Sequence, residues 1–261
     1  MHSDKTLIDS GKSGWNGDYL LFGHDIGLLV LSLYMHATTN ISAGWHFRSQ
    51  SCYPFSRYKV RVGDHNLERD ERSQQEIAPE KFFVHQDYVD RKFVNDIALI
   101  KLEEEVELSP FVRTLCLPEK DEGDLAIPMK YGFATGWGVT QALRNGEDPE
   151  PENRYSKRLQ YSTYTIQSDE LCANRSAIAI NSTVAFCAGD GIGGNDTCHG
   201  DSGGAFVREG KRGEDYRWVA AGLVSWGLGC AQKNQYGYYT RVYPFTDWIK
   251  NTIKENTEAG D

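Results

Sequence analysis

Hydrophobic positions along the chain occur in many short runs that are separated by turn residues. Residues 58–62 alternate between apolar and charged side chains, and 82–84 and 97–102 are short apolar runs bounded by polar or glycine-containing segments. Runs of this length and alternation are typical of strands that bury one or both faces. The pattern therefore predicts an all-β protein.

The same pattern predicts further strands at 20–22, 26–34, 131–137, 158–166, 218–226 and 236–243. Segment 26–34 also resembles the short core of a signal peptide. However, His24 and Asp25 come directly before it and no small-residue cleavage site is evident. We interpret it as a strand and predict no signal peptide in this chain.

Two short helices and two irregular segments complete the prediction. Ser168 is placed as an N-cap before a helix that starts at Asp169, and apolar residues at 245, 248, 249 and 253 predict a C-terminal amphipathic helix. Prolines and charges predict an exposed loop over 141–157. Segment 110–124 is predicted to be a linker between two halves.

Composition narrows the classes of partner. The chain has 261 residues, 39% of them hydrophobic, and a net charge of −9. An acidic surface disfavours nucleic acid and anionic membranes. No segment approaches the roughly 20 apolar residues that a membrane span requires, so we expect neither partner. Six cysteines fit an extracellular domain with two or three disulfides.

Ser202 stands in a run that is suited to nucleophilic chemistry. Gly200 precedes it by two residues, and Gly203 and Gly204 follow it. In a tight turn the hydroxyl would be uncovered, and the N–H groups of Gly200 and Ser202 could point at one oxygen. The alternative is an ordinary glycine-rich turn, which this motif alone does not exclude.

Several spaced motifs decide between these interpretations. They are Asn95–Ile100, Thr135–Gly138, Asp196–Gly204, Ser225–Gly227 and the closing Asp247–Ile249. Together and in this order, they resemble the trypsin and chymotrypsin-like serine proteases. Segments 217–220 and 236–239 are most similar to the catalytic domains of mosaic complement-initiating proteases.

The resemblance implies two six-stranded antiparallel β-barrels with a cleft between them and a C-terminal helix. The first barrel is expected to be incomplete, because its early strands are poorly specified. We expect a protease domain over 36–257, preceded by a divergent and partly disordered segment over 1–35.

The resemblance also assigns roles to residues. Ser202 would attack the scissile carbonyl, Asp96 would orient a histidine, and the Gly200 and Ser202 amides would form the oxyanion hole. Asp96 could instead be a solvated carboxylate in a turn, although the apolar run after it weakens that interpretation.

Asp196 matches the base of the specificity pocket, where a carboxylate would select Arg or Lys. Ser225, Trp226, Gly227 and Gly237 match its walls and the substrate-binding strand. Tyr236 stands where an aromatic residue accompanies a sodium site in some relatives. The family needs no organic cofactor and no catalytic metal, and its substrates are proteins or peptides.

The same resemblance implies disulfides between Cys172 and Cys187 and between Cys198 and Cys230. A third family bridge is missing, because Gly132 and Arg208 occupy its two positions. Cys116 matches a cysteine that tethers upstream domains in multi-domain relatives.

The chain departs from the family before residue 52. Ser51 occupies the position of the catalytic histidine, and a hydroxyl does not take up a proton near neutral pH as imidazole does. His46, five residues earlier, is the remaining candidate for a shifted base. Cys52 has no cysteine partner at the family position, where His36 stands.

No activation N-terminus of the Ile-Val-Gly-Gly type occurs in 1–35, so Asp201 is expected to lack its ammonium partner. One event, such as a wrong exon boundary, would explain all these changes together. Two functions follow: a secreted endopeptidase that cleaves after Arg or Lys, or an inactive homologue that acts as a binding or regulatory module. For the chain as written we expect little activity.

Overall fold

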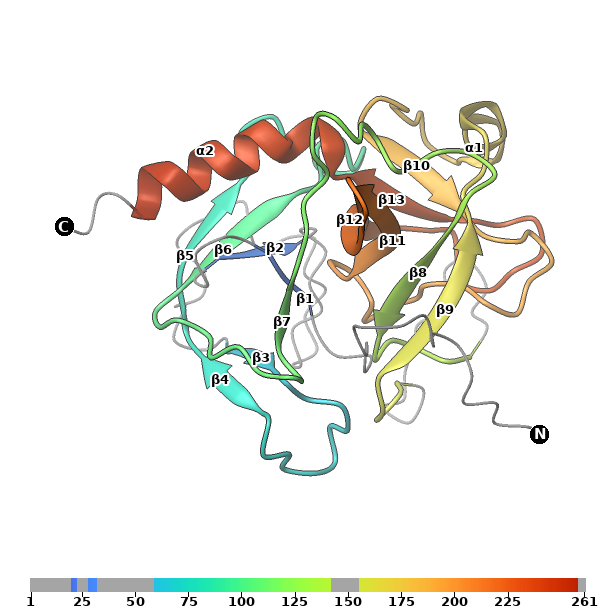
Figure 1. The fold of residues 1–261 in the computed structure, drawn as a ribbon. Helices are drawn as coiled ribbons and strands as arrows, with labels where there is room; N and C mark the ends of the chain where they lie inside the picture. The colour runs from blue at the N-terminus through green and yellow to red at the C-terminus, as the bar shows by residue number, and fades with distance from the viewer. Residues whose placement is uncertain (1–19, 23–27, 32–58, 142–154, 258–261) are drawn as a thin grey trace.

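The computed structural model describes residues 20–22, 28–31, 59–141 and 155–257, which form two β-rich halves lying side by side (Figure 1). Strands β1–β7 belong to the first half, and β8–β13 belong to the second. Helix α2 (Thr246–Thr257) lies across the first half although it follows the last strand of the second. The fold is therefore all-β with a C-terminal helix, as the sequence predicts.

The second half is one six-stranded antiparallel sheet with the order β10-β13-β12-β11-β8-β9. Its strands are β8 (Tyr131–Gly136), β9 (Gln160–Thr165), β10 (Ala185–Ala188), β11 (Ala205–Arg212), β12 (Asp215–Trp226) and β13 (Gly237–Arg241). The two end strands meet through a bridge between Ile166 and Ala188. This contact closes the sheet into a barrel and leaves no open edge there.

The first half is an incomplete barrel in the described residues, as the sequence analysis expects. In the described residues its strands form three small sheets: β2-β6-β5, β3-β4 and β1-β7. The strands are β1 (Leu20–Phe22), β2 (Leu28–Leu31), β3 (Val60–Val62), β4 (Gln75–Ile77), β5 (Pro79–Val84), β6 (Ala98–Leu102) and β7 (Arg113–Leu115).

The pairing of β1 with β7 is parallel, which corrects the expectation of purely antiparallel pairing in this half. Both strands have three residues, so the ladder between them is short. The predicted strands at 20–22 and within 26–34 are confirmed.

The main hydrophobic core lies between the two halves. Buried side chains from β6, the residue before it and β7 pack with those of β11, β12 and the C-terminal segment. The set is Ile97, Leu99, Leu115, Ala205, Val207, Ala220, Leu223, Val242, Phe245 and Ile249. A second cluster fills the second barrel around Phe186, Phe206 and Tyr239. Because one core joins both halves, the two halves are held in fixed relation.

Two helices cap the second half and the chain end. Helix α1 (Asp169–Arg175) begins at Ser168, whose side chain accepts a hydrogen bond from the N–H of Leu171. This is the N-cap that the sequence predicts. A short 3-10 turn, η4 (Tyr243–Phe245), leads into α2. Neither α-helix in the described residues is long or apolar enough to cross a membrane.

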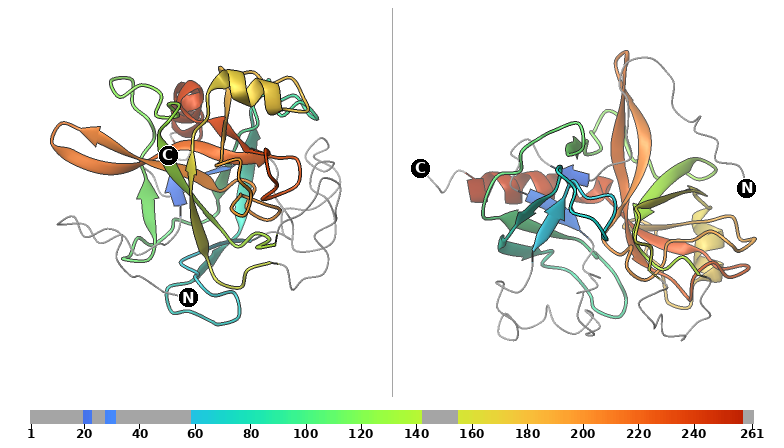
Figure 2. Two further views of the ribbon diagram at one scale, coloured as in Figure 1. Left: turned by 90° about the vertical axis from the view of Figure 1, so that its right-hand side faces the viewer. Right: turned by 90° about the horizontal axis from the view of Figure 1, so that it is seen from below.

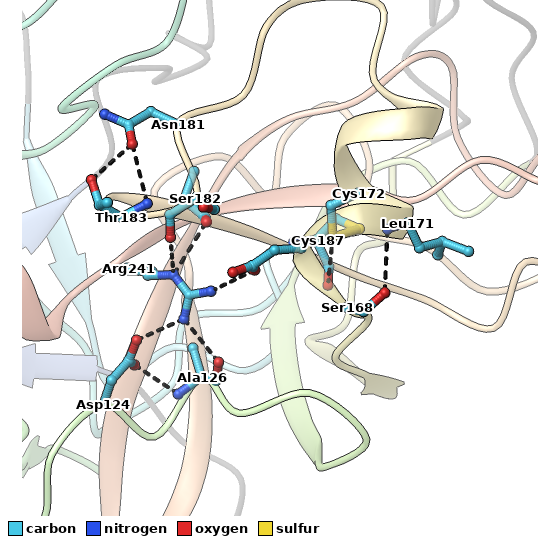
Figure 3. Close-up of polar contacts among 12 residues, drawn as sticks. Asp124, Ala126, Ser168, Leu171, Cys172, Asn181, Ser182, Thr183, Cys187 and Arg241 are labelled. Carbon is cyan, nitrogen blue, oxygen red and sulfur yellow. Dashed lines mark hydrogen bonds and ion pairs between the residues drawn. A yellow bond between two sulfur atoms is a disulfide. The ribbon is translucent and has the colours of Figure 1, made fainter.

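A buried arginine ties α1 to the barrel (Figure 3). The guanidinium of Arg241, on β13, forms ion pairs with Asp124 and Asp169 and donates to the backbone carbonyls of Ser182 and Ala126. Five fixed donors make Arg the side chain suited to such a junction. The network fixes the segments that flank strand β10.

Sequence patterning missed some elements. Strand β7 lies inside the predicted linker 110–124, and β4, β10 and β11 were not predicted. Strands β11 and β12 form a long hairpin that projects from the body of the molecule (Figure 2). The sequence did not predict this hairpin because residues 208–217 are rich in charged side chains. Both faces of the projecting part contact solvent, so the chain shows no alternation of apolar and polar residues there.

Candidate active site

Ser202 lies in a tight turn between the Cys198–Cys230 disulfide and the start of β11. Gly200 and Gly203 have φ values of +96° and +85°, in the left-handed region that favours glycine. The N–H of Gly203 donates to Val224 O at 2.9 Å, and the N–H of Gly204 donates to Asp201 O at 2.9 Å. The turn thus anchors Ser202 against β12.

Gly200 has a second reason to be glycine. A Cβ there would lie 3.0 Å from the Tyr155 ring and 3.1 Å from Gly138 Cα. Within the described residues, neither the Gly200 nor the Ser202 N–H donates a hydrogen bond to protein. Both N–H groups are therefore available to an oxygen of a bound molecule.

Asp96 is buried and held from the opposite barrel. Its side chain is 1% exposed, and Ser225 Oγ donates to Asp96 Oδ2 at 2.5 Å. Thr240 Oγ1 donates to its backbone carbonyl at 2.9 Å. A solvated turn carboxylate would have neither feature, so the structure removes that alternative for Asp96.

A cleft of about 200 Å³ lies beside Ser202. Its walls come from both halves of the molecule: Phe93 from the first, and His199, Ser202, Ser225, Trp226 and Gly227 from the second. The nucleophile candidate, the substrate-strand candidates and the hydroxyl that binds Asp96 are thus brought together.

Asp196 lies in a second cavity of about 220 Å³, which it shares with Asp201. The N–H of Ala231 donates to Asp196 Oδ2 at 3.2 Å, whereas Oδ1 is buried and has no hydrogen-bond partner among the described residues. Burial raises the pKa of Asp196 to about 7. The two cavities are adjacent, because Thr197, Cys198 and Cys230 line both.

Gly237 borders the unpaired oxygen. A Cβ at this position would lie 3.0 Å from Asp196 Oδ1, from Thr197 Oγ1 and from Tyr239 Oη. A Cβ at Gly227 would meet its nearest atom, Gly229 O, at 3.5 Å, which is ordinary contact. A side chain at position 237 would therefore crowd the Asp196 carboxylate, whereas Gly227 lines the cleft and has room for a Cβ.

Asp201 has hydrogen-bond partners that the sequence did not reveal. The N–H of Gly138 donates to its Oδ1 at 2.8 Å, and the N–H of Cys198 donates to its Oδ2 at 3.0 Å. Burial nevertheless raises the pKa of Asp201. Backbone amides thus hold this carboxylate beside Ser202, and none of the salt bridges among the described residues includes Asp201.

Both expected disulfides are formed. Cys172 is bonded to Cys187 and Cys198 to Cys230. The second bridge crosses the boundary between the two cavities. Of the described cysteines, Cys116 is free and half-buried.

The run from Trp45 to Cys52 lies outside the described residues, and so do His24, His36, His46 and Ser51. The structure therefore does not place the residue at the histidine position. It does describe two aromatic residues that the sequence argument missed, Phe93 and Tyr238, which stack on Trp226. Their contact with Trp226 could be predicted only by knowing how the strands and loops of the folded chain pair.

The comparison with known families agrees with this geometry. The sequence profile of the Trypsin family matches residues 38–249. The chain belongs to the trypsin family.

Individual trypsins are similar over most of their length. Trypsin of Xenopus laevis is 37% identical over 216 residues, covering 83% of this chain and 80% of that protein. Human serine protease 1 is 37% identical over 220 residues, covering 83% and 79%. Trypsin-3 of Salmo salar is 35% identical over 216 residues, covering 83% and 82%.

By family, the chain is a trypsin-like serine protease domain, a hydrolase class whose substrates are proteins. The closer likeness to complement-initiating proteases stays a prediction.

Proposed function

We propose that this chain is a trypsin-like endopeptidase domain whose cleft selects Arg or Lys, and that its turnover is low because Ser51 replaces the catalytic histidine. The observation that carries the specificity is the buried Asp196, with one oxygen unpaired and Gly237 beside it. A guanidinium or ammonium group would pair that oxygen and remove the penalty of an isolated buried carboxylate.

In the reaction we propose, Ser202 Oγ attacks the scissile carbonyl carbon and its proton passes to a base. The Gly200 and Ser202 N–H groups hold the oxyanion. The C–N bond then breaks, the leaving amine takes the proton, and water hydrolyses the acyl-serine ester. Asp96, fixed by Ser225, would orient the base.

The proposed reaction lacks its general base, because Ser51 stands at the position of the catalytic histidine. Loss of a triad member reduces kcat by roughly a millionfold, and the oxyanion hole and substrate binding supply what remains. An inactive homologue that binds Arg- or Lys-containing segments is the second candidate function, and Ser51 is the residue that favours it. Both candidates share the Asp196 pocket.

Hydrolysis of an arginyl amide substrate tests the proposed low turnover. We expect turnover by the wild-type chain to lie within about tenfold of that by Ser202→Ala, which lacks the nucleophile. Turnover at ordinary protease rates that Ser202→Ala abolishes would contradict the inactivity. In that case, loss of activity in His46→Ala would identify a shifted base.

Binding tests the pocket independently of chemistry. Benzamidine, a flat aromatic cation, should bind the wild-type chain and Ser202→Ala alike, and Asp196→Ala should abolish that binding. Asp190→Ala is the matched control, because Asp190 is an exposed carboxylate in the same loop. Equal affinities for Asp196→Ala and wild type would exclude the proposed pocket.

We further propose an extracellular location, supported by the two disulfides and by the family. Cys116 is proposed to tether an upstream segment, since it is free and half-buried among the described residues. Expression of this chain with an upstream segment attached would test this through a reducible cross-link that Cys116→Ser removes.

A further inference from the structure

Tyr238 stands directly behind the cleft residue Trp226. Tyr238 is cross-strand partner of Trp226 on β12 and of Cys187 on β10. The Tyr238 and Trp226 rings are parallel within 1°, with centroids 3.8 Å apart. Trp226 lines the cleft, but Tyr238 is only 2% exposed and is not part of the cleft wall.

The hydroxyl of Tyr238 reaches a second wall of the same cleft. It donates to the carbonyl of Cys172 in α1 at 3.1 Å, and the N–H of Ser176 donates to the same carbonyl at 3.0 Å. Ser176 Oγ in turn donates to Ile178 O at 2.5 Å. Ala177 and Ile178 line the cleft.

One side chain therefore contacts the supports of two cleft walls. The Tyr238 ring stacks on the Trp226 indole, on the side away from the cleft. The Tyr238 hydroxyl binds the last turn of α1, which is followed in the chain by the cleft residues Ala177 and Ile178. The Cys172–Cys187 disulfide packs in the same cluster as Tyr238. Because Tyr238 and both cysteines are buried, the ring cannot move without disturbing the disulfide or the indole.

We propose that Tyr238 is a positioning residue for the cleft: it sets the place of Trp226 and of 177–178, and so controls binding of the substrate residues before the Arg or Lys. This inference rests on the proposed function for its substrate, but its structural part does not. The pocket around Asp196 is lined by other residues, so its affinity for a small cation should not depend on Tyr238.

The first measurement follows Trp226 without any ligand. In protein labelled with 5-fluorotryptophan, the ¹⁹F resonance of Trp226 is assigned by its loss in Trp226→Phe. Tyr238→Leu should move that resonance, while Tyr238→Phe, which keeps the ring, should leave it nearly unchanged. Phe133→Leu is the matched control, since Phe133 contacts a different tryptophan, Trp218, at 5.5 Å.

The second measurement compares two ligands in the Ser202→Ala background, so that no hydrolysis occurs. One is benzamidine, and the other is a tripeptide amide with two apolar residues before arginine. Tyr238→Leu should weaken tripeptide binding about tenfold, the upper range for loss of an aromatic pair. Benzamidine affinity should stay within about twofold, and Tyr238→Phe should weaken the tripeptide by about twofold to threefold.

The outcomes separate the two proposals. An unmoved Trp226 resonance in Tyr238→Leu, or equal loss of both ligands, would overturn the role of Tyr238. If the wild-type chain bound neither ligand, the proposed specificity would fail, and the ligand-free resonance alone would decide whether Tyr238 positions Trp226. Tyr238→Met, which fills the same space with a flexible side chain, replaces the leucine variant if that variant does not fold.

Discussion

At the scale of single residues, the site is organised around carboxylates whose environments differ. Asp96 is paired with a hydroxyl and Asp201 with two backbone amides, whereas Asp196 keeps one buried oxygen without a hydrogen-bond partner among the described residues. The unpaired oxygen of Asp196 makes it the group that a cationic ligand would satisfy. A ligand that carries its own positive charge should therefore compete with a proton for this site.

We predict that benzamidine affinity depends on pH through Asp196. Burial raises the pKa of the free carboxyl to about 7, so below that pH the group is protonated and must lose its proton before it pairs with a cation. The association constant should rise about tenfold per pH unit below 7 and level off above 7. Calorimetric titrations in buffers of different ionisation heat would count the released proton. A flat profile across this range would contradict the raised pKa.

A second residue-scale prediction concerns the pocket wall. In Gly237→Ala the new Cβ would lie 3.0 Å from Asp196 Oδ1, where it blocks approach of the cation. Benzamidine affinity should fall by at least about a hundredfold, as expected when a buried charge pair cannot form. Gly227→Ala, whose Cβ has ordinary contacts, should fold normally and lose less. Equal losses in both variants would mean that Gly237 does not border the ligand.

At the scale of elements, β8 and β11 are joined without the family's third disulfide. Arg208 on β11 donates from Nε to Tyr131 O at 2.9 Å and from a terminal nitrogen to Leu125 O at 2.6 Å. Gly132 could not simply become cysteine, since a Cβ there would lie 2.2 Å from the Phe206 ring. A charged side chain and a close aromatic contact thus stand where the family has a covalent bond.

We predict that Arg208→Ala lowers the free energy of unfolding by about 1–2 kcal/mol, because two hydrogen bonds from a charged donor, one of them part-buried, are lost. The matched control is Arg212→Ala on the same strand, whose side chain is 64% exposed and contacts Glu119 at 3.4 Å. That change should stay within about 0.5 kcal/mol. Urea denaturation of both variants checks the difference. Equal stability would show that the Arg208 bonds are not structural.

The same comparison of elements shows which of them could be predicted from the sequence. Strands with one buried face and the Ser168 cap follow from local pattern, and both disulfide pairings follow from the family resemblance. The β11–β12 hairpin and the parallel β1–β7 pair did not follow, because solvent on both faces or a three-residue ladder leaves no periodic signal. The hydrogen bond between Ser225 and Asp96 joins residues far apart in sequence, and only the folded chain shows it.

At the scale of the whole molecule, the C-terminal segment locks the two halves together. Phe245 and Ile249 belong to the core between the halves. His85, in the loop after β5, packs against Phe245 at 5.1 Å and against Trp248 at 4.9 Å. A loop of the first barrel thus packs against the C-terminal segment, and the loop residue in this contact, His85, can take up a proton.

This contact should make stability depend on pH. Burial lowers the pKa of His85 from 6.5, and the N–H of Asp87 donates to His85 Nδ1 at 3.2 Å, which requires an unprotonated nitrogen. The unfolded chain therefore binds a proton more readily than the folded chain. The contribution of His85 is fully present above about pH 6.5 and is lost as pH falls toward the lowered pKa.

The test compares urea denaturation at about pH 7.5 and about pH 5.5, on either side of the ordinary histidine pKa. Asp196, whose pKa is raised, acts in the opposite direction over this range, so the informative quantity is the difference between variants. His85→Gln, which remains neutral, should lose less stability on acidification than the wild type. His65→Gln removes an exposed histidine and should follow the wild-type pH dependence. If His85→Gln followed it too, protonation of His85 would not weaken the contact between the last helix and the first barrel.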